Sequence, residues 1–486
     1  MACLALQGNA QQTLTLDSCR ALALRNNKTL SAARLKQDMA HYTAKAAKTK
    51  YLPRVDATGG YMLTSREISL LSKQQKSTLS NLGSNTATSI SNNVTPMITE
   101  LVQNGIITQD QAASMGKLIG GVGNTLATAT NQVGQKIVDA LRTDTRNMYA
   151  VSVIVRQPVY MGGAITAANN IARINERMAA SSIQATTQNT LYDIDQTYWT
   201  VVSLKHKRDL AESFLNVVKK LNEDVGKMVA QGVATRADKL KVDVKVNEAE
   251  MTLTQAENGL SLSRMLLCQL CGLPAESEIT LADESSDNLP VSVSAVDGDE
   301  NTAMENRPEV KMLQDAVDIA KQSTKLMRAS YLPQVALMGG YTATNPNVYN
   351  GFERNLSGVW NIGVMVRVPI WNWMESSYKV KASKIATTIA SLERDDVKEK
   401  IGLQVSQSTF KVKEASKRLA MAKKNVENAE ENLRCANLGF KEGVMQTTEV
   451  MAAQTAWLQA QSQKIDAEID VCLSQTNLKK ALGTLQ

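Results

Sequence analysis

Two long segments of the chain carry apolar residues at the spacing of a coiled coil. The first seam steps by four and three residues and consists of Phe214, Val218, Leu221, Val225 and Met228. The second seam steps in the same way and consists of Val426, Ala429, Leu433, Ala436 and Phe440. A mean spacing of about 3.5 residues is typical of helices that share a seam. Gly232 and Gly443 interrupt the two patterns, which predicts long helical hairpins at about 164–273 and 375–486.

Ahead of each hairpin the pattern changes to the alternation of a β-strand. On the first strand the more apolar face consists of Val55, Ala57, Gly59, Tyr61 and Leu63. The same alternation predicts four strands in all, at about 54–64, 149–157, 334–343 and 360–368. Strands of about ten residues have the length that spans a membrane.

The order of these elements is duplicated along the chain. Residues 51–61 recur as 331–341, an offset of 280, and residues 155–160 recur as 366–371, an offset of 211. The second offset also relates Gly232 to Gly443 and Gly272 to Gly483. A register kept over such distances indicates a tandem duplication.

The two offsets differ by 69 residues, which places an insertion in the first copy. We expect a first repeat at 11–273 that contains this insertion at about 65–146, a linker at 274–306 and a second repeat at 307–486. The insertion begins rich in Ser, Thr and Asn and then becomes amphipathic, which predicts one or two short helices. The linker has several acidic residues and neither Lys nor Arg, which favours an irregular, solvated connector.

The first ten residues resemble the end of a secretory signal. Gly8 and Ala10 stand at the −3 and −1 positions of a cut before Gln11, so residues 1–10 are interpreted as a signal-peptide remnant. An ordinary N-terminus and a lipidated Cys3 are the alternatives.

Composition narrows the class of protein. Pro accounts for only 9 of 486 residues, which favours long uninterrupted helices. With only two His, His-based zinc sites and Ser-His catalysis are disfavoured. The net charge of +7 is spread along the chain without a dense basic face, so we expect no nucleic-acid partner.

No run of 18 apolar residues is present, so no membrane-spanning helix is expected. Alternating strands give a weaker signal, and a transmembrane β-barrel remains open. Four strands cannot close a barrel, and an open sheet edge cannot stay unpaired in lipid. Two chains would supply eight strands and three chains twelve, which is wide enough for a lumen.

Several short segments together match one known family: Tyr-Leu-Pro at 51–53 and 331–333, Asn306–Val310, Arg156–Gly163, Val368–Trp371, the glycine turns and Ala481–Leu485. By these segments the chain resembles the TolC-like outer-membrane efflux proteins over nearly its whole length. The resemblance implies an α+β membrane protein, a tandem-duplicated protomer that contributes four strands to a trimeric 12-stranded β-barrel continued by a long α-helical coiled-coil barrel.

The same resemblance implies a function without catalysis or a cofactor. It predicts a homotrimeric exit duct in a Gram-negative-type outer membrane, with a large periplasmic part. The duct passively conducts substrates of a tripartite efflux or type I secretion system, through a periplasmic adaptor and an inner-membrane RND or ABC pump. A periplasmic coiled-coil scaffold without a pore is the alternative.

The hairpin turns and the residues beside them are the candidate sites. Adaptor docking is expected at Gln231, Gly232 and Val233 and at Glu442, Gly443 and Val444, unless each glycine serves only its own turn. By resemblance, Asp238 and Glu449 form a periplasmic gate; the alternative is that both are ordinary solvated helix residues.

Aromatic residues and cysteines supply the remaining candidates. An interfacial aromatic belt is expected at the junctions of strands and helices, with core packing as the alternative; its members are Tyr51, Tyr160, Trp371 and Trp373. Cys268 and Cys271 form a CxxC motif that we interpret as structural, with a disulfide or metal as the alternative. Cys19, Cys435 and Cys472 are predicted to be packing residues.

The insertion joins the strand ends opposite the hairpins. It is therefore predicted to form a partly helical extracellular cap that narrows the exit.

Overall fold

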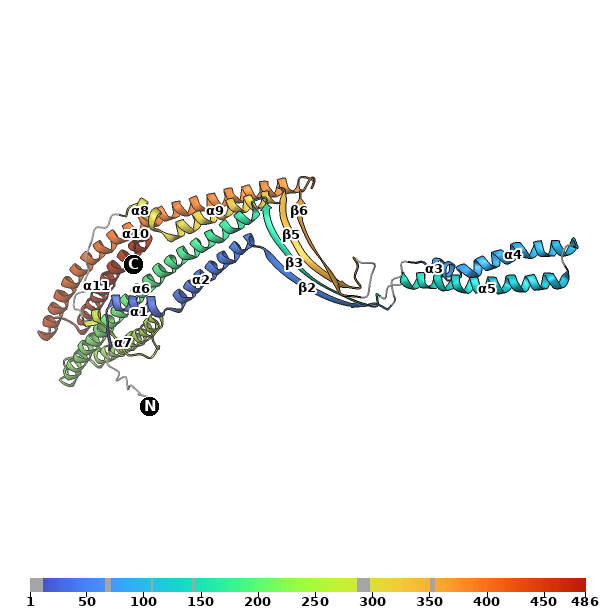
Figure 1. Cartoon of the computed structure of the whole chain (residues 1–486). Helices are drawn as coiled ribbons and strands as arrows, with labels where there is room; N and C mark the ends of the chain where they lie inside the picture. The colour runs from blue at the N-terminus through green and yellow to red at the C-terminus, as the bar shows by residue number, and fades with distance from the viewer. Residues whose placement is uncertain (1–11, 66–70, 106–107, 142–144, 286–297, 350–354) are drawn as a thin grey trace, which may run out of the picture. The chain divides into compact units, whose positions relative to one another are not determined.

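The computed structural model describes residues 12–65, 71–105, 108–141, 145–285, 298–349 and 355–486 (Figure 1). The proposed signal remnant and Cys3 lie outside these residues. The chain forms two compact units, one of residues 1–49, 163–331 and 370–486 and the other of 50–162 and 332–369. The first is largely helical and the second contains a four-stranded sheet.

The helical unit contains two copies of one set of helices. Its first copy contains α1 (Leu16–Asn26), α2 (Lys28–Lys48), α6 (Ala164–Ala230) and α7 (Arg236–Cys271). Its second copy contains α8 (Glu300–Asn306), α9 (Pro308–Ala329), α10 (Glu375–Lys441) and α11 (Thr447–Ala481). Both α6 and α10 have 67 residues, as expected for a duplication that kept its register.

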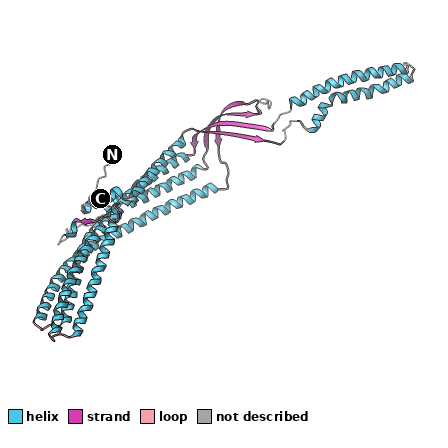
Figure 2. Cartoon of the chain, turned by 90° about the horizontal axis from the view of Figure 1, so that it is seen from below, coloured by secondary structure: helices cyan, strands magenta, loops and turns pink. Residues whose placement is uncertain are grey.

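The two long hairpins pack against each other through α6 and α11 (Figure 2). The predicted seam residues Phe214, Val218, Leu221 and Val225 are at most 5% exposed and share a core with Ala436. Burial of apolar side chains at about 25 cal/mol per Å² therefore holds both hairpins together. No described helix is long and apolar enough to cross a membrane.

A second core lies where the hairpin bases meet α1. The Arg20 guanidinium of α1 donates to the buried Asp195 carboxylate of α6 at 2.7 and 2.5 Å. Beside it, β1 (Gln12–Leu14) pairs in parallel with β4 (Ile279–Leu281). Since Ile279 and Leu281 are buried, the expectation of an irregular, solvated connector at 274–306 is wrong for its described part. Residues 300–306 also form α8.

The other unit contains an antiparallel sheet in the order β2 (Arg54–Leu63), β3 (Asn147–Met161), β5 (Gln334–Asn345) and β6 (Ser357–Arg367). In β2 and β3, Arg54 is opposite Arg156 and Leu63 is opposite Asn147. The predicted end of the second strand at 157 is wrong, because β3 continues to Met161. The ladder shifts register between Pro158 and Tyr160, so the missing proline N–H is accommodated at an irregularity.

The described residues of the insertion form three helices, α3 (Lys73–Ser80), α4 (Leu82–Gln103) and α5 (Gln109–Ala140). The expectation of one or two short helices is therefore wrong, since α4 has 22 residues and α5 has 32. The Ser/Thr-rich stretch is itself helical. The Thr86 and Thr88 hydroxyls donate to the carbonyls of Leu82 and Ser84, four residues earlier, which satisfies these side chains inside a helix.

Candidate functional site: the two hairpin turns

Both hairpins turn through the same backbone conformation. Gly232 has φ +77° and Gly443 has φ +74°, in the left-handed region that favours glycine. The Val233 N–H donates to the Met228 carbonyl at 2.9 Å, and the Val444 N–H donates to the Gly439 carbonyl at 2.9 Å. These bonds close each preceding helix in the manner of a Schellman motif.

The predicted docking residues are all exposed at these turns. They are Gln231, Gly232 and Val233 in one hairpin and Glu442, Gly443 and Val444 in the other. Val233 is 69% exposed and Val444 is 80% exposed. A Cβ atom on either turn glycine would meet no atom within 4 Å, so the surface there is open. Each turn thus presents one apolar side chain on an accessible backbone.

The first predicted gate acid, Asp238, caps the start of α7. The Asp238 N–H donates to the Thr235 Oγ1 at 3.2 Å, and the Thr235 N–H donates back to the Asp238 carboxylate at 3.3 Å. The hydrogen bonds from Thr235, aided by Lys241, hold the pKa of Asp238 below its usual value. This reciprocal pair is a capping box, so Asp238 has a local folding role.

The second gate acid, Glu449, occupies the equivalent position in α11. The Gln446 N–H donates to its Oε2 at 2.9 Å. The reading of both acids as ordinary solvated helix residues is therefore incomplete, because each stabilises the first turn of its helix. The lowered pKa of Asp238 is compatible with a negative charge at the first turn. A gate role stays a prediction.

Directly behind the turns the two hairpins differ. In the first hairpin, the Asp243 Oδ1 accepts from the Asn222 Nδ2 at 3.0 Å and from the Lys239 Nζ at 2.9 Å. Lys239 also donates to Asn222. These hydrogen bonds, with the charge of Lys239, lower the pKa of Asp243. We call Asn222, Lys239 and Asp243 the polar triad.

The polar triad has no counterpart at the equivalent positions of the second hairpin, 211 residues on. These hold Leu433, Val450 and Gln454. Val450 is fully buried, and Gln454 is 2% exposed with an Oε1 that has no hydrogen-bond partner among the described residues. Sequence reasoning missed this contrast, although comparison at the 211-residue offset displays it.

The four belt aromatics are exposed and belong to different units. Tyr51 (47% exposed) and Tyr160 (48%) lie in the strand unit, whereas Trp371 (70%) and Trp373 (82%) lie in the helical unit. The two Trp rings contact edge to face at 5.8 Å. None of the four is packed in a core of this chain, and their place at a membrane interface stays a prediction.

The cysteines divide into a buried cluster and exposed or half-buried residues. Cys19, Cys268 and Cys271 are fully buried in one core, and the Cys271 thiol donates to the Cys19 carbonyl at 3.7 Å. Burial raises the pKa of Cys268, which disfavours a reactive thiolate. The expectation that Cys435 is a packing residue is wrong, because its side chain is exposed on α10. Within the described residues, no cluster of three or more His, Cys, Asp or Glu side chains is placed to hold a metal ion.

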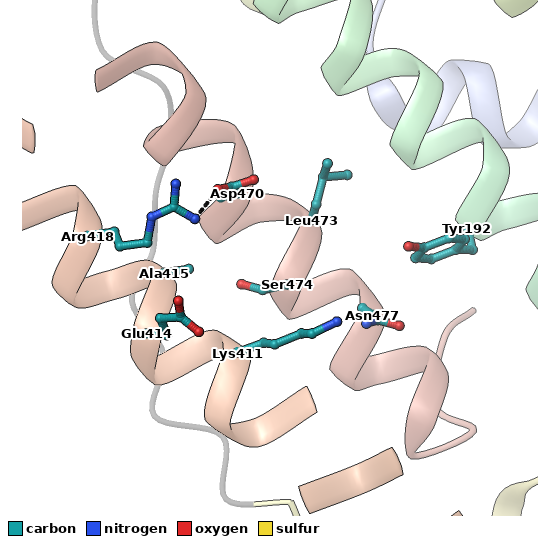
Figure 3. Close-up of a pocket in the computed structure, with 9 residues that line it drawn as sticks. All are labelled: Tyr192, Lys411, Glu414, Ala415, Arg418, Asp470, Leu473, Ser474 and Asn477. Atoms are coloured by element: carbon teal, nitrogen blue, oxygen red, sulfur yellow. Dashed lines mark hydrogen bonds and ion pairs between the residues drawn. The ribbon is translucent and has the colours of Figure 1, made fainter. Parts of the chain in front are cut away.

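A groove of about 360 Å³ lies between α6, α10 and α11 (Figure 3). Arg418 of α10 and Asp470 of α11 form an ion pair across its wall at 3.1 Å. Tyr192, Lys411 and Glu414 also line it, so charges of both signs are mixed. None of the residues predicted as sites lies there, and the mixed lining selects no class of ligand.

Long antiparallel helical hairpins joined to a four-stranded sheet define the protomer fold of outer-membrane efflux channels. VceC of Vibrio cholerae has this fold, with a TM-score of 0.70 and 14% identity over 96% of each chain. The outer membrane protein TolC of Vibrio cholerae is 21% identical over 313 residues, covering 64% of this chain and 71% of TolC. The alkaline protease secretion protein AprF of Pseudomonas aeruginosa is 22% identical over 263 residues, about half of each chain.

The family model described as "Outer membrane efflux protein" matches residues 117–273 and 301–484. These two ranges are most of the chain, and they follow the two repeats. The chain therefore belongs to the outer membrane efflux protein family. It is an outer-membrane protein and not an enzyme, and the TolC-like resemblance seen in its motifs is confirmed.

Proposed function

We propose that this chain is the protomer of a trimeric exit duct that works with a periplasmic adaptor and an inner-membrane pump. The observation that carries the proposal is the apolar face of the sheet. Its members are between 37% and 78% exposed and come from all four strands: Val55, Tyr61, Leu63, Val151, Val153, Val155, Leu337, Tyr341, Trp360, Ile362, Val364 and Val366. A soluble monomer rarely exposes so large an apolar surface, and lipid is the partner that suits it.

The opposite face of the sheet is more polar. Thr58, Ser152 and Thr342 stand side by side there, and the Thr58 and Ser152 hydroxyls are 2.7 Å apart. Alternation of an apolar and a polar face across four strands suits a barrel wall with lipid outside and water inside.

The two outer strands supply the argument for assembly. Among the strands that the structure describes, β2 and β6 each have a hydrogen-bonded neighbour on one side only. In lipid their free backbone groups need another strand, and β6 of one copy can pair with β2 of the next. Three copies would close a 12-stranded barrel, with Tyr51, Tyr160, Trp371 and Trp373 as its interfacial belt.

The hairpins then form the periplasmic cylinder, with the two turns at its end. Exposed Val233 and Val444 suit insertion between apolar side chains of an adaptor hairpin. The name of AprF, an alkaline protease secretion protein, supports secretion as one branch of the proposal, beside efflux. In this proposal the inner-membrane pump is of the RND or ABC type.

Adaptor docking is tested without altering the glycine conformation. We expect a Val233→Asp, Val444→Asp double variant to lose co-purification with the adaptor and to lose transport, because a charge replaces each exposed apolar contact. The matched control is Val233→Leu, Val444→Leu, which keeps an apolar side chain at both positions and should keep co-purification and transport. Retained co-purification in the first variant would contradict docking at the turns.

A further inference from the structure

The insertion pairs its helices through small residues. A Cβ atom on Gly83 of α4 would lie 2.2 Å from the Ala127 carbonyl oxygen of α5. A Cβ atom on Gly134 of α5 would lie 1.9 Å from the Leu79 carbonyl oxygen of α3. Backbones this close leave no room for a larger side chain at these two places, so small residues set the spacing of the helices there.

Six large apolar side chains of α5 nevertheless stay exposed, whereas Val138 of the same helix is buried. They follow one another at steps of three, four or seven residues and are between 40% and 67% exposed: Met115, Leu118, Val122, Leu126, Val133 and Ile137. We call these six residues the α5 stripe. Steps of this kind place all six on one side of a helix, in the pattern of a coiled-coil seam without a partner.

Charge is nearly absent from the same region. Between Ser77 and Gln135 the ionisable residues are Glu100, Asp110 and Lys117, whereas 21% of the whole chain is charged. A solvated helix pair would ordinarily carry charges on its open faces. The near absence of charge also removes electrostatic repulsion between identical copies.

We infer that the α5 stripe packs against the insertions of neighbouring copies of this chain. The inference rests on the proposed trimer. The insertion joins Leu63 to Asn147, which are paired at one end of the sheet, and the opposite strand ends continue into the helical unit. Closing the open edges of β2 and β6 with neighbouring copies therefore gathers three insertions at one end of the barrel.

Tethering at that end makes the association effectively intramolecular. Linked modules experience effective concentrations in the millimolar range, so a weak seam suffices. The three helix pairs then form a bundle that extends the duct beyond the sheet. The partner is a second copy of the chain, because the assembly that covers the sheet edges also brings the stripes together.

Cysteine crosslinking tests the inference. In a Cys435→Ser background, Leu126→Cys places a thiol on the stripe, and Thr128→Cys places one on the opposite side of the same helix; both positions are exposed. With a short bismaleimide applied to the protein in membranes, we expect on the order of tenfold more inter-chain product from Leu126→Cys than from Thr128→Cys. A Leu118→Asp, Val122→Asp change added to Leu126→Cys should abolish the product while the trimer persists.

The outcomes separate this inference from the proposed function. Equal crosslinking of Leu126→Cys and Thr128→Cys in an intact trimer overturns the inference and leaves the exit duct standing. A product that persists with the two added Asp residues also contradicts it. If the unmodified protein is not a trimer, the proposed function itself fails.

Discussion

The two helical hairpins have nearly the same backbone and different interiors. Their long helices both have 67 residues, and both turns use a glycine with φ near +75°, as Gly232 (+77°) and Gly443 (+74°) show. Behind the first turn lies the polar triad, in which the Lys239 and Asp243 side chains are 32% and 42% exposed. Behind the second turn, Val450 is fully buried and Gln454 is 2% exposed.

This difference separates the backbone features that the two copies share from the side chains in which they differ. Helix length and turn conformation are nearly the same in both copies. The side chains behind the turns were free to diverge, since either a solvated ion pair or an apolar contact can join two helices. Directly behind the turn, the first hairpin is therefore joined by charged and polar side chains and the second by buried ones.

The largest expected effect follows from placing the charge of the first hairpin into the second. Val450→Lys copies Lys239 but provides no carboxylate, because Gln454 stands where Asp243 would be. An unpaired buried ammonium should lower the free energy of unfolding by about 3 kcal/mol or more, measured by denaturant titration of helical circular dichroism. Val444→Lys, at an 80% exposed position of the same hairpin, is the control and should stay within about 0.5 kcal/mol.

A smaller effect is expected from removing charge where it is native. Asp243→Ala removes the carboxylate that accepts from Lys239 and Asn222, but Lys239 still donates to Asn222 and water can replace the lost oxygen. We therefore expect a small loss in the free energy of unfolding, measured in the same titration. Asp224→Ala removes a more exposed ion pair with Lys227 and should cost less. A larger loss for Asp224 would contradict the role of the polar triad.

The hairpins should also respond differently to acid. The folded pKa values of Asp238 and Asp243 lie below their usual values, so their stabilisation is present above about pH 3.9 and is lost as pH falls through the folded values. Amide exchange measured between pH 5 and pH 3 should therefore show a larger loss of protection at the α6–α7 turn than at the α10–α11 turn. Asp243→Asn should reduce this difference; an unchanged difference would exclude Asp243 as its source.

The smallest effect on stability is expected from neutralising the capping acids. Asp238→Asn and Glu449→Gln keep an oxygen acceptor at each cap and remove the charge. If both acids line a narrow entrance, the double variant should lose cation selectivity in a planar bilayer, while unfolding changes little. Selectivity equal to that of the wild type would leave them as capping residues alone.

Periodicity was sufficient to predict the strands and hairpins, because burial and backbone pairing decide both patterns. The repeat predicted the equivalence of the turns. The helices of the insertion and the end of the second strand were predicted less well, because both depend on local hydrogen bonds. The Ser- and Thr-rich start of the insertion is helical because hydroxyls such as those of Thr86 and Thr88 bond to helix carbonyls. The second strand was expected to end at about 157, but β3 continues because a register shift accommodates Pro158.

The sequence predicted where the two hairpin turns lie but not the hydrogen bonds made by the side chains beside them. The spacing of Thr235 and Asp238 contains a capping signature that was visible in the sequence and was not used. The exposure of Cys435 depends on which side of α10 faces the other helices, and the apolar spacing alone did not determine this. The polar triad joins residues of two helices, so only equivalent positions in the duplication could indicate it.

The most direct test of the account is the assembly and conductance of the purified protein in lipid. The mass of the detergent-solubilised protein would be measured first, followed by single-channel recording after reconstitution. The account predicts a trimer with steady unitary conductance. A protein that remains monomeric in lipid, or a trimer without conductance, would contradict the proposal that this chain forms an outer-membrane exit duct.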